Sequence, residues 1–147
     1  MSRPDSLILT FNAMAHEIDL TELVVRVGPS RFATTRTPAD GPLTVHTFEG
    51  PTERHRYGFD QPIQDAPTIE YSTIDVVLVP GVLFGADGSR LGHGMGYYDR
   101  LLARCRPDIE RIGITISSMV TTTLPTDEND ISMTHIADES GVMSLTK

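Results

Sequence analysis

The sequence has few aromatic residues and no long apolar segment. It contains one cysteine, Cys105, and no tryptophan among its 147 residues. A single cysteine cannot form an intramolecular disulfide, so we expect a reducing, cytoplasmic setting. No stretch approaches the ~20 apolar residues that a membrane-spanning helix needs. The apolar residues that follow Asp5 form too short a run for a secretory leader, and we expect none.

Basic residues are also scarce. The chain has 12 lysines and arginines against 20 acidic residues, which gives a formal net charge of −8. This balance argues against a nucleic-acid groove or an anionic membrane surface as the main partner. Any anionic small molecule must therefore be held by local groups. The five histidines are too dispersed for a zinc site, and the length favours one domain over residues 1–147.

The most informative stretch begins with residues 74–80, an apolar run rich in β-branched residues and closed by Pro80 and Gly81. It predicts a strand buried on both faces, as found in parallel sheets covered by helices. A glycine-rich loop follows, and then apolar residues at helical spacing that end at Cys105. The spacing favours a buried Cys105 over a catalytic thiol. The loop is thus expected at the carboxyl end of a central strand, where α/β proteins bind ligands.

The end of that loop, Gly92-His93-Gly94-Met95-Gly96, allows backbone N–H groups to converge beside the positive end of the next helix. This is the chemistry of a phosphate cradle, although the pattern is neither a dinucleotide fingerprint nor a P-loop, and a flexible loop is the alternative. Arg90, Arg100 and Arg104 flank it. Asp99 is a candidate magnesium ligand or simply an acidic residue favoured near a helix start.

A second strand, loop and helix are predicted near the beginning of the chain. The pattern indicates a strand at residues 6–11, a loop at 12–17, and a capped helix start at Asp19 and Glu22, with Gly28 ending the helix. Further strands are expected at 31–36, 43–48 and 111–117, a closing edge strand and tail at 134–137 and 141–145, and an irregular connection at 49–67. Arg36 is an open case: it could approach an anionic substrate tail or be an unremarkable strand-end arginine.

Three blocks of sequence carry a family resemblance. Residues 75–84, 88–92 and 94–100, including Arg90-Leu91-Gly92 and Tyr97-Tyr98-Asp99, resemble the signature of the 5-formyltetrahydrofolate cyclo-ligases, or methenyltetrahydrofolate synthetases. The resemblance continues at 124–130 and, more weakly, at 14–19, and residues 57–62 are an imperfect counterpart of a turn that lies near the family's active site. It implies a three-layer α/β domain with a mainly parallel sheet, Rossmann-like and of the NagB/RpiA/CoA-transferase-like architecture.

The resemblance also implies an activity: ATP-dependent closure of 5-formyltetrahydrofolate to 5,10-methenyltetrahydrofolate with release of ADP and phosphate. It assigns catalysis to Arg90 and Tyr97, and Mg²⁺ to Asp99 and Asp130, for which a solvated acidic turn is the alternative. The implied ATP-binding residues are Arg90, Leu91, Gly92, His93, Gly94, Met95, Gly96, Tyr97 and Tyr98. The implied folate-binding residues are Asn12, Met14, Glu17, His93, Gly94, Met95, Gly96 and Tyr97.

The chain departs from the family pattern in two places. Family members normally begin with a helix that carries lysines and arginines, whereas Arg3 is the only basic residue before the first predicted strand here. His93 and Met95 stand where the family commonly has a larger basic or aromatic residue, and lysine or glycine. We therefore expect either self-association through an uncovered apolar face or a poorly stable monomer. A non-catalytic folate or nucleotide binder is the main alternative, and an enzyme resembling sugar-phosphate isomerases or CoA-transferases is a weaker one.

Overall fold

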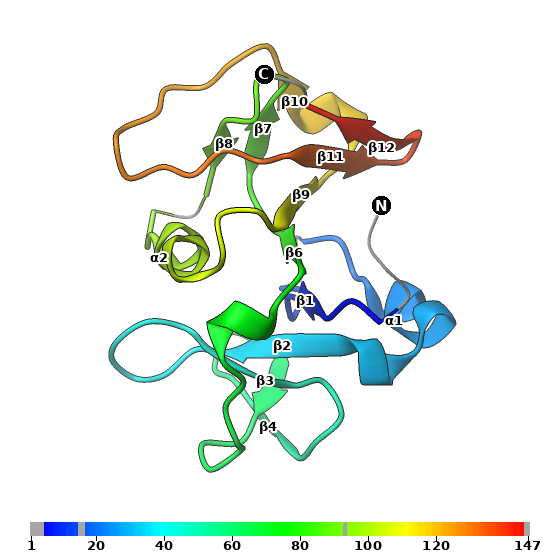
Figure 1. Cartoon of the computed structure of the whole chain (residues 1–147), viewed down its shortest axis with the longest axis vertical. Coiled ribbons are helices and arrows are strands. Elements are labelled where there is room, and N and C mark those ends of the chain that lie inside the picture. Colours follow the sequence, from blue (N-terminus) through cyan, green and yellow to red (C-terminus); the bar gives the residue numbers. More distant parts are fainter. Residues whose placement is uncertain (1–4, 15–16, 93, 146–147) are drawn as a thin grey trace.

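The computed structural model describes residues 5–14, 17–92 and 94–145. Its main element is a seven-stranded sheet in the order β12-β11-β9-β6-β1-β2-β3 (Figure 1). The five inner strands run parallel, and β3 and β12 pair antiparallel at the two edges. The strands are β1 (Ile8–Thr10), β2 (Phe32–Arg36), β3 (Thr44–Thr47), β6 (Val76–Val79), β9 (Glu110–Ile114), β11 (His135–Asp138) and β12 (Gly141–Ser144). The predicted α/β class and mainly parallel sheet are confirmed.

Strand β6 lies at the centre of the sheet, between β1 and β9, and all four of its residues are buried. Val77 and Val79 join a cluster with Leu101 and Leu102 of helix α2 (Tyr97–Arg104). Val76 and Leu78 face the opposite side, in a cluster with Val24 of helix α1 (Thr21–Val27). Because successive side chains of a strand point to opposite faces, a continuous apolar run at β6 is what a two-sided core requires. The buried strand predicted at 74–80 is confirmed.

Helix α1 differs from its predicted start. The helix begins at Thr21 with Leu20 as its N-cap, and the capping box between Asp19 and Glu22 does not form. Instead, Asp19 accepts hydrogen bonds from the backbone N–H and hydroxyl of Thr21, at 2.9 and 2.6 Å. Val24 is the helix's buried residue, while Leu23 and Val27 are exposed. The predicted end at Gly28 is confirmed, since its N–H donates to Val24 O and its φ of +116° suits glycine.

The stretch between β6 and α2 is more structured than a loop. It holds β7 (Leu83–Gly85) and β8 (Arg90–Leu91), which form a small sheet with β10 (Val120–Thr121). Phe84 of β7 is fully buried, and its ring occupies the space above Gly113 of β9. The small sheet therefore packs against the main sheet through a position where glycine leaves room for a ring.

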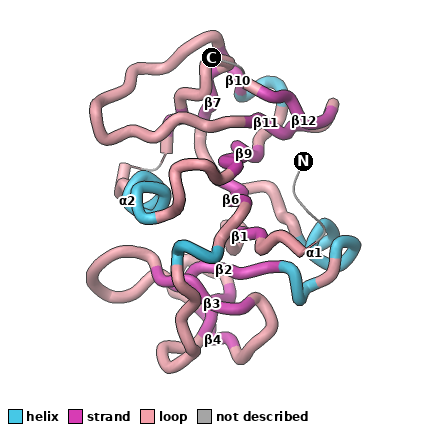
Figure 2. The backbone as a smooth tube through the Cα atoms, in the orientation of Figure 1, coloured by secondary structure: helices cyan, strands magenta, loops and turns pink. Residues whose placement is uncertain are grey.

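The predicted irregular connection at 49–67 is wrong over part of its length. It contains an antiparallel hairpin of β4 (Thr52–Arg54) and β5 (Asp60–Pro62), of which β4 is labelled in Figures 1 and 2, and β5 contacts β2. Arg36 fixes this hairpin to the end of β2, because its guanidinium donates to Glu53 Oε1 at 2.6 Å and to Pro62 O at 2.7 Å. The sequence does not predict the hairpin, because its strands are only three residues long and lack an alternating apolar pattern.

Three short 3₁₀ helices complete the described secondary structure: Pro29–Arg31, Tyr71–Thr73 and Ser117–Met119. Within the described residues, no helix is long and apolar enough to cross a membrane. Cys105 is buried, as predicted, and its thiol donates weakly to Leu101 O at 3.5 Å. Burial raises the pKa of this thiol to about 11, which keeps it protonated and unreactive at neutral pH. Self-association stays a prediction.

Candidate functional site

The two predicted ligand loops lie at one edge of the main sheet. Strands β1 and β6 are parallel neighbours, with Ile8 opposite Val76 and Leu9 opposite Val77. The loop after β1 and the glycine-rich stretch after β6 therefore leave the sheet side by side at its carboxyl edge. This is the edge at which doubly wound sheets bind ligands.

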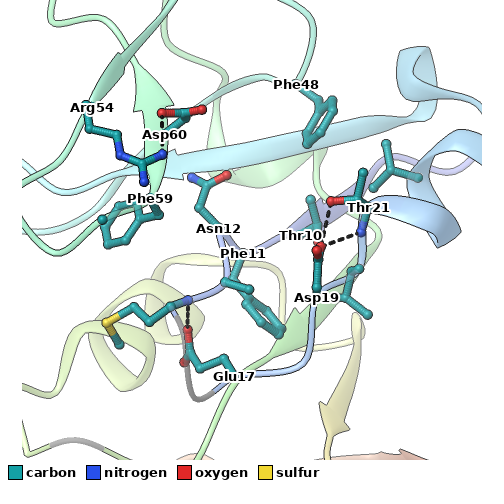
Figure 3. Close-up of a pocket in the computed structure, with 15 residues that line it drawn as sticks. Thr10, Phe11, Asn12, Glu17, Asp19, Thr21, Phe48, Arg54, Phe59 and Asp60 are labelled. Atoms are coloured by element: carbon teal, nitrogen blue, oxygen red, sulfur yellow. Dashed lines mark hydrogen bonds and ion pairs between the residues drawn. The ribbon is translucent and has the colours of Figure 1, made fainter.

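A cavity of about 490 Å³ opens beside the carboxyl end of β1. Its described lining residues are Thr10, Phe11, Asn12, Ala13, Met14, Glu17, Asp19, Leu20, Thr21, Val24, Phe48, Arg54, Gly58, Phe59 and Asp60. Figure 3 shows the hairpin residues on one side, Asp19 and Thr21 on the other, and Asn12 between them. The volume lies within the range of small-molecule pockets, roughly 300–1,000 Å³. A ligand here would contact three separate segments of the chain.

The three folate-binding residues predicted in the first loop all line this cavity. Asn12 donates its side-chain amide to Thr35 O at 3.1 Å, which fixes its orientation. Glu17 accepts the Met14 N–H at 2.9 Å through Oε1 and also donates its own N–H to Met14 O. The loop is thus closed on itself, with the amide of Asn12 and the carboxylate of Glu17 held in place. Such preorganised polar groups are typical of binding sites.

Aromatic rings form part of the cavity wall. Phe48, just after β3, meets Phe32 edge to face at a centroid separation of 6.4 Å. Phe59, from the β4–β5 hairpin, stacks on the His55 ring at 4.5 Å with an interplanar angle of 6°. Their partners hold both rings in fixed positions, and flat apolar surfaces of this kind suit a planar heterocycle.

Arg54 is the one basic residue among the described lining residues, against the three carboxylates of Glu17, Asp19 and Asp60. It pairs with Asp60 at 3.2 Å, and both side chains are largely exposed. Arg36, by contrast, has a side chain only 15% exposed and is committed to Glu53 and Pro62. A ligand carboxylate at the mouth of the cavity would therefore meet Arg54 and not Arg36.

Tyr98 connects the cavity side of the site to the glycine-rich stretch. Its side chain is hydrogen-bonded to Thr35, and burial of its phenolic end raises its pKa well above the ordinary value. The Thr35 bond acts in the opposite direction, and the charge of Glu17 raises the pKa further. The Arg90 guanidinium lies 5.9 Å from the Tyr98 ring centroid. Tyr98 is thus a neutral phenol between the Glu17 carboxylate and Arg90.

The residues predicted to bind ATP do not line the cavity in the part of the chain that the structure describes. Gly94, Met95 and Gly96 form an exposed turn, with positive φ at Gly94 (+86°) and Gly96 (+70°) and open space where a Cβ would stand. Gly96 is the N-cap of α2, whose first-turn N–H groups have no intrahelical acceptors. The exposed turn therefore retains the backbone donors expected of a phosphate cradle.

Three further residues that are predicted to bind ATP lie beside this turn. Leu91 is half exposed in β8, Gly92 lies against the Arg90 guanidinium, and the Tyr97 ring lies under Arg100 at 5.3 Å. His93, predicted for both the ATP and the folate sites, is outside the described residues.

Arg90 is directed into the protein. Its side chain is 8% exposed, donates to Pro80 O at 3.0 Å and lies 3.7 Å from the Asp99 carboxylate. These contacts tie the glycine-rich stretch to the end of β6 and to the first turn of α2. For Arg90 to contact a phosphate, the phosphate would have to approach the guanidinium through the exposed turn of Gly94, Met95 and Gly96.

The predicted magnesium ligands come from two segments that are in contact. Asp99 Oδ1 accepts the Ile131 N–H at 3.3 Å, and Asp130 accepts the Asp127 N–H at 2.9 Å. Among the described residues, no group of three His, Cys, Asp or Glu side chains could hold a metal. The contact places Asp99 beside the segment that carries Asp130, and an Mg²⁺ ion bound by these two carboxylates would have to take its other ligands from water and phosphate.

Several cavity residues have no sequence signal as site residues: Thr10, Thr21, Phe48 and Arg54. Thr10 has the pattern of an ordinary strand residue, and the hairpin residues fall within a stretch without periodicity. The resemblance points to a turn near an active site at 57–62, which overlaps the hairpin. The strands of the hairpin, however, cannot be inferred from it.

Comparison with known proteins identifies the relatives of this chain. The sequence model of the 5-formyltetrahydrofolate cyclo-ligase family matches residues 10–139. The 5-formyltetrahydrofolate cyclo-ligase of Saccharomyces cerevisiae is 42% identical over 74 residues, which are 46% of this chain and 35% of the yeast protein. That of Mycolicibacterium smegmatis is 32% identical over 72 residues, 48% of this chain and 37% of the relative. The matched parts thus amount to little more than a third of these relatives.

Two solved structures resemble the whole described fold. The 5,10-methenyltetrahydrofolate synthetase of Aquifex aeolicus superposes with a TM-score of 0.78 at 27% identity, covering 97% of this chain and 73% of that one. The corresponding protein of Mycoplasma pneumoniae gives a TM-score of 0.69 at 22% identity, covering 91% and 74%. The second comparison bears on the fold alone.

Proposed function

The chain belongs to the 5-formyltetrahydrofolate cyclo-ligase family, and from this premise we propose that it closes 5-formyltetrahydrofolate to 5,10-methenyltetrahydrofolate at the expense of ATP. The observation that carries the proposal is that the two predicted ligand loops are adjacent. The loop with Asn12 and Glu17 follows β1, the glycine-rich stretch follows β6, and these strands are parallel neighbours. A folate in the cavity would therefore have its reacting atoms close to a nucleotide at the exposed glycine turn.

The chemistry requires one phosphoryl transfer and one ring closure. The formyl oxygen takes the terminal phosphoryl group of ATP, so ADP leaves and the oxygen becomes part of a good leaving group. The neighbouring folate nitrogen then attacks the formyl carbon, loses its proton, and expels phosphate. The protein's contribution is to position the two substrates and to stabilise charge on the phosphoryl oxygens.

Individual residues receive specific roles in this proposal. Asn12, Met14 and Glu17 hold the folate, and the backbone of the turn at Gly94 and Gly96 holds the phosphates. Tyr97 and Arg90 act beside the transferred phosphoryl group, which approaches Arg90 through the turn at Gly94 and Gly96. Mg²⁺, held by Asp99 and Asp130, would neutralise phosphate charge when it is bound.

The test is turnover by the purified chain. With 5-formyltetrahydrofolate, ATP and Mg²⁺, the near-ultraviolet absorbance of the methenyl product should rise, and it should not rise when ATP is omitted. A Glu17→Gln variant should bind folate less tightly, whereas Glu22→Gln, on the exposed face of α1, should behave like the wild type. Absence of methenyl product in the complete mixture, from a chain that binds both substrates, would refute the catalytic proposal.

One observation favours a second candidate, a folate binder without catalytic activity. The cations nearest the glycine turn already have partners: Arg90 contacts Pro80 and Asp99, and Arg100 lies over Tyr97. A phosphate chain would then depend mainly on backbone donors, without the roughly 1.5–3 kcal/mol that each hydrogen bond from a charged side chain contributes. Tight equilibrium binding of folate without detectable nucleotide binding would support this candidate.

A further inference from the structure

The tip of the β4–β5 hairpin is organised around the imidazole of His55. Its Nδ1 accepts the backbone N–H of Tyr57 at 3.1 Å, and its ring stacks on that of Phe59 at a centroid separation of 4.5 Å. The backbone closes the same turn, because the His55 N–H donates to Phe59 O at 2.8 Å and the Gly58 N–H donates to His55 O at 2.9 Å. One side chain thus contacts both the turn and the ring that follows it.

Phe59 belongs to the cavity wall, whereas His55 is not among the described lining residues. Phe59, Arg54 and Asp60 bring the hairpin to the cavity (Figure 3). The two strands of the hairpin are only three residues long, and β4 is exposed throughout. A short hairpin is marginally stable by itself, so contacts within the tip fix the position of the Phe59 ring. His55 would therefore act on a ligand through Phe59.

The bond from Tyr57 requires that Nδ1 of His55 carry no proton. A neutral imidazole has one acceptor nitrogen, whereas a protonated imidazole has two donors and no acceptor. Histidine is the side chain whose charge ordinarily changes between about pH 5 and pH 8. After protonation, two N–H groups would face each other across the turn, and the ring would have to leave this position and its stack on Phe59.

The charged groups near His55 do not favour an added proton. Both carboxylates of the hairpin already pair with arginines, Glu53 with Arg36 at 2.6 Å and Asp60 with Arg54 at 3.2 Å. Two arginines are its neighbours in the chain, and two further carboxylates come from the segment after β1 that lines the same cavity: Arg54, Arg56, Glu17 and Asp19. Protonation of His55 therefore adds a cation to a hairpin tip that already carries two.

We propose that neutral His55 is a positioning residue for the ligand of this cavity: it holds the Phe59 ring in the wall, and its protonation releases the ring and weakens binding. The ligand class is a flat heterocycle, one face of which contacts Phe59. This inference rests on the proposed function, in which the pterin ring of the reduced folate is that heterocycle. It adds a dependence of folate affinity on pH that originates outside the cavity lining.

Two substitutions separate the two contacts of His55. His55→Phe keeps a flat ring for the stack and has no nitrogen that can take a proton. His55→Asn keeps an acceptor for the Tyr57 N–H, as asparagine does in turns, and removes the ring. His135→Asn is the matched control, since His135 is also half-buried and its Nδ1 contacts the Thr134 hydroxyl at 2.8 Å. It lies on β11, which is separated by β9, β6 and β1 from the strand that the hairpin contacts.

The measurement is calorimetric binding of 5-formyltetrahydrofolate to the whole chain, without ATP, at about pH 8 and about pH 5.5, on either side of the range in which histidine titrates. Acidification should raise the wild-type Kd about two- to tenfold, the range that corresponds to the loss of one aromatic pair. His135→Asn should follow the wild type. His55→Phe should bind like the wild type at the higher pH and keep that affinity at the lower one. His55→Asn should bind weakly at both.

A second variant tests whether His55 acts through Phe59. Phe59→Leu should raise Kd at the higher pH and should remove the pH dependence, because no ring is left to be positioned. Adding His55→Asn to Phe59→Leu should then have no further effect, whereas two independent contributions would add. Additive losses in the double variant would overturn the inference.

Three other results would also overturn it while the proposed function stands. They are an equal wild-type Kd at the two pH values, a pH dependence that persists in His55→Phe, and wild-type affinity of His55→Asn at the higher pH. If the wild-type chain does not bind 5-formyltetrahydrofolate at the higher pH, the proposed function fails first, and the inference fails with it.

Discussion

The Arg90 guanidinium and the Asp99 carboxylate lie 3.7 Å apart, beneath the glycine-rich stretch that leads into α2. Asp99 also accepts the backbone N–H of Ile131 at 3.3 Å. This carboxylate therefore joins three segments: β8, the start of α2 and the loop that carries Asp130. Its position is consistent with two different functions, a magnesium ligand and an anchor for Arg90, and the two can be separated by experiment.

We expect Asp99→Asn and Asp130→Asn each to raise the Mg²⁺ concentration required for half-maximal turnover, by about tenfold, because each removes one of the two carboxylates of the proposed magnesium site. Glu128→Gln, an exposed carboxylate on the same acidic loop, is the control and should not change the requirement. The measurement is a magnesium titration of methenyl formation. Loss of activity in Asp99→Asn that added Mg²⁺ does not restore would instead identify Asp99 as the anchor of Arg90.

Arg54 is expected to recognise the acidic tail of the substrate. It is the basic residue among the described cavity lining, and its bond to Asp60 is solvent-exposed. Arg54→Gln should weaken binding of 5-formyltetrahydrofolate by about two- to fivefold, the modest value typical of exposed ion pairs. The same change should not affect a 5-formyl pterin that lacks the glutamate tail.

The control for Arg54 is Arg56 on the same hairpin, which lies over the Tyr57 ring and is not among the described cavity residues. Arg56→Gln should leave both ligands unaffected in calorimetry. An equal fall in affinity for the ligands with and without the tail would mean that Arg54 acts through the hairpin's structure and not through the carboxylates.

Gly113 is expected to be intolerant of any side chain. A Cβ there would lie 2.6 Å from Cδ1 and 3.0 Å from Cζ of Phe84, a fully buried ring. Gly113→Ala should therefore destabilise the protein by about 1–3 kcal/mol or more, as overpacking does. Gly50→Ala is the matched control, because its Cβ would lie 3.9 Å from the Thr47 hydroxyl oxygen, an ordinary contact distance. Denaturant unfolding measures both, and Phe84→Leu should partly rescue Gly113→Ala.

Much of the sheet could be predicted from local sequence, because the strand of residues 76–79 is apolar at every position and its loop and helix follow in order. The cavity could not. Its outer wall depends on a hairpin held by Arg36 contacts to Glu53 and Pro62, which lie far along the chain from Arg36. Long-range ion pairs leave no periodic signal. The family resemblance supplies Asn12, Met14 and Glu17, but nothing in the sequence marks Phe48 or Arg54 as cavity residues.

Asp87 links the turn between β7 and β8 to the loop that follows β10. Its Oδ1 accepts the Ser89 hydroxyl at 2.5 Å and its Oδ2 accepts the Thr123 hydroxyl at 2.5 Å. The Ser89 side chain, then that of Thr123, then the Ser89 N–H lower the pKa of Asp87 from 3.8 to about 2. Because the folded-state pKa is the lower one, the carboxylate's contribution to stability is complete above the unfolded value of 3.8. It is lost as the pH falls towards 2.

Asp87→Asn should therefore lower the denaturant midpoint at pH 7, where the carboxylate accepts all these bonds, and should have much less effect near pH 2, where about half of the wild-type carboxylates are protonated and most of their contribution to stability is lost. The wild-type midpoint should fall more steeply than that of the variant between pH 4 and pH 2. Asp40→Asn, in an exposed turn before β3, should run parallel to the wild type over this range. Parallel curves for Asp87→Asn and the wild type would show that Asp87 does not tie the two loops together through its charge.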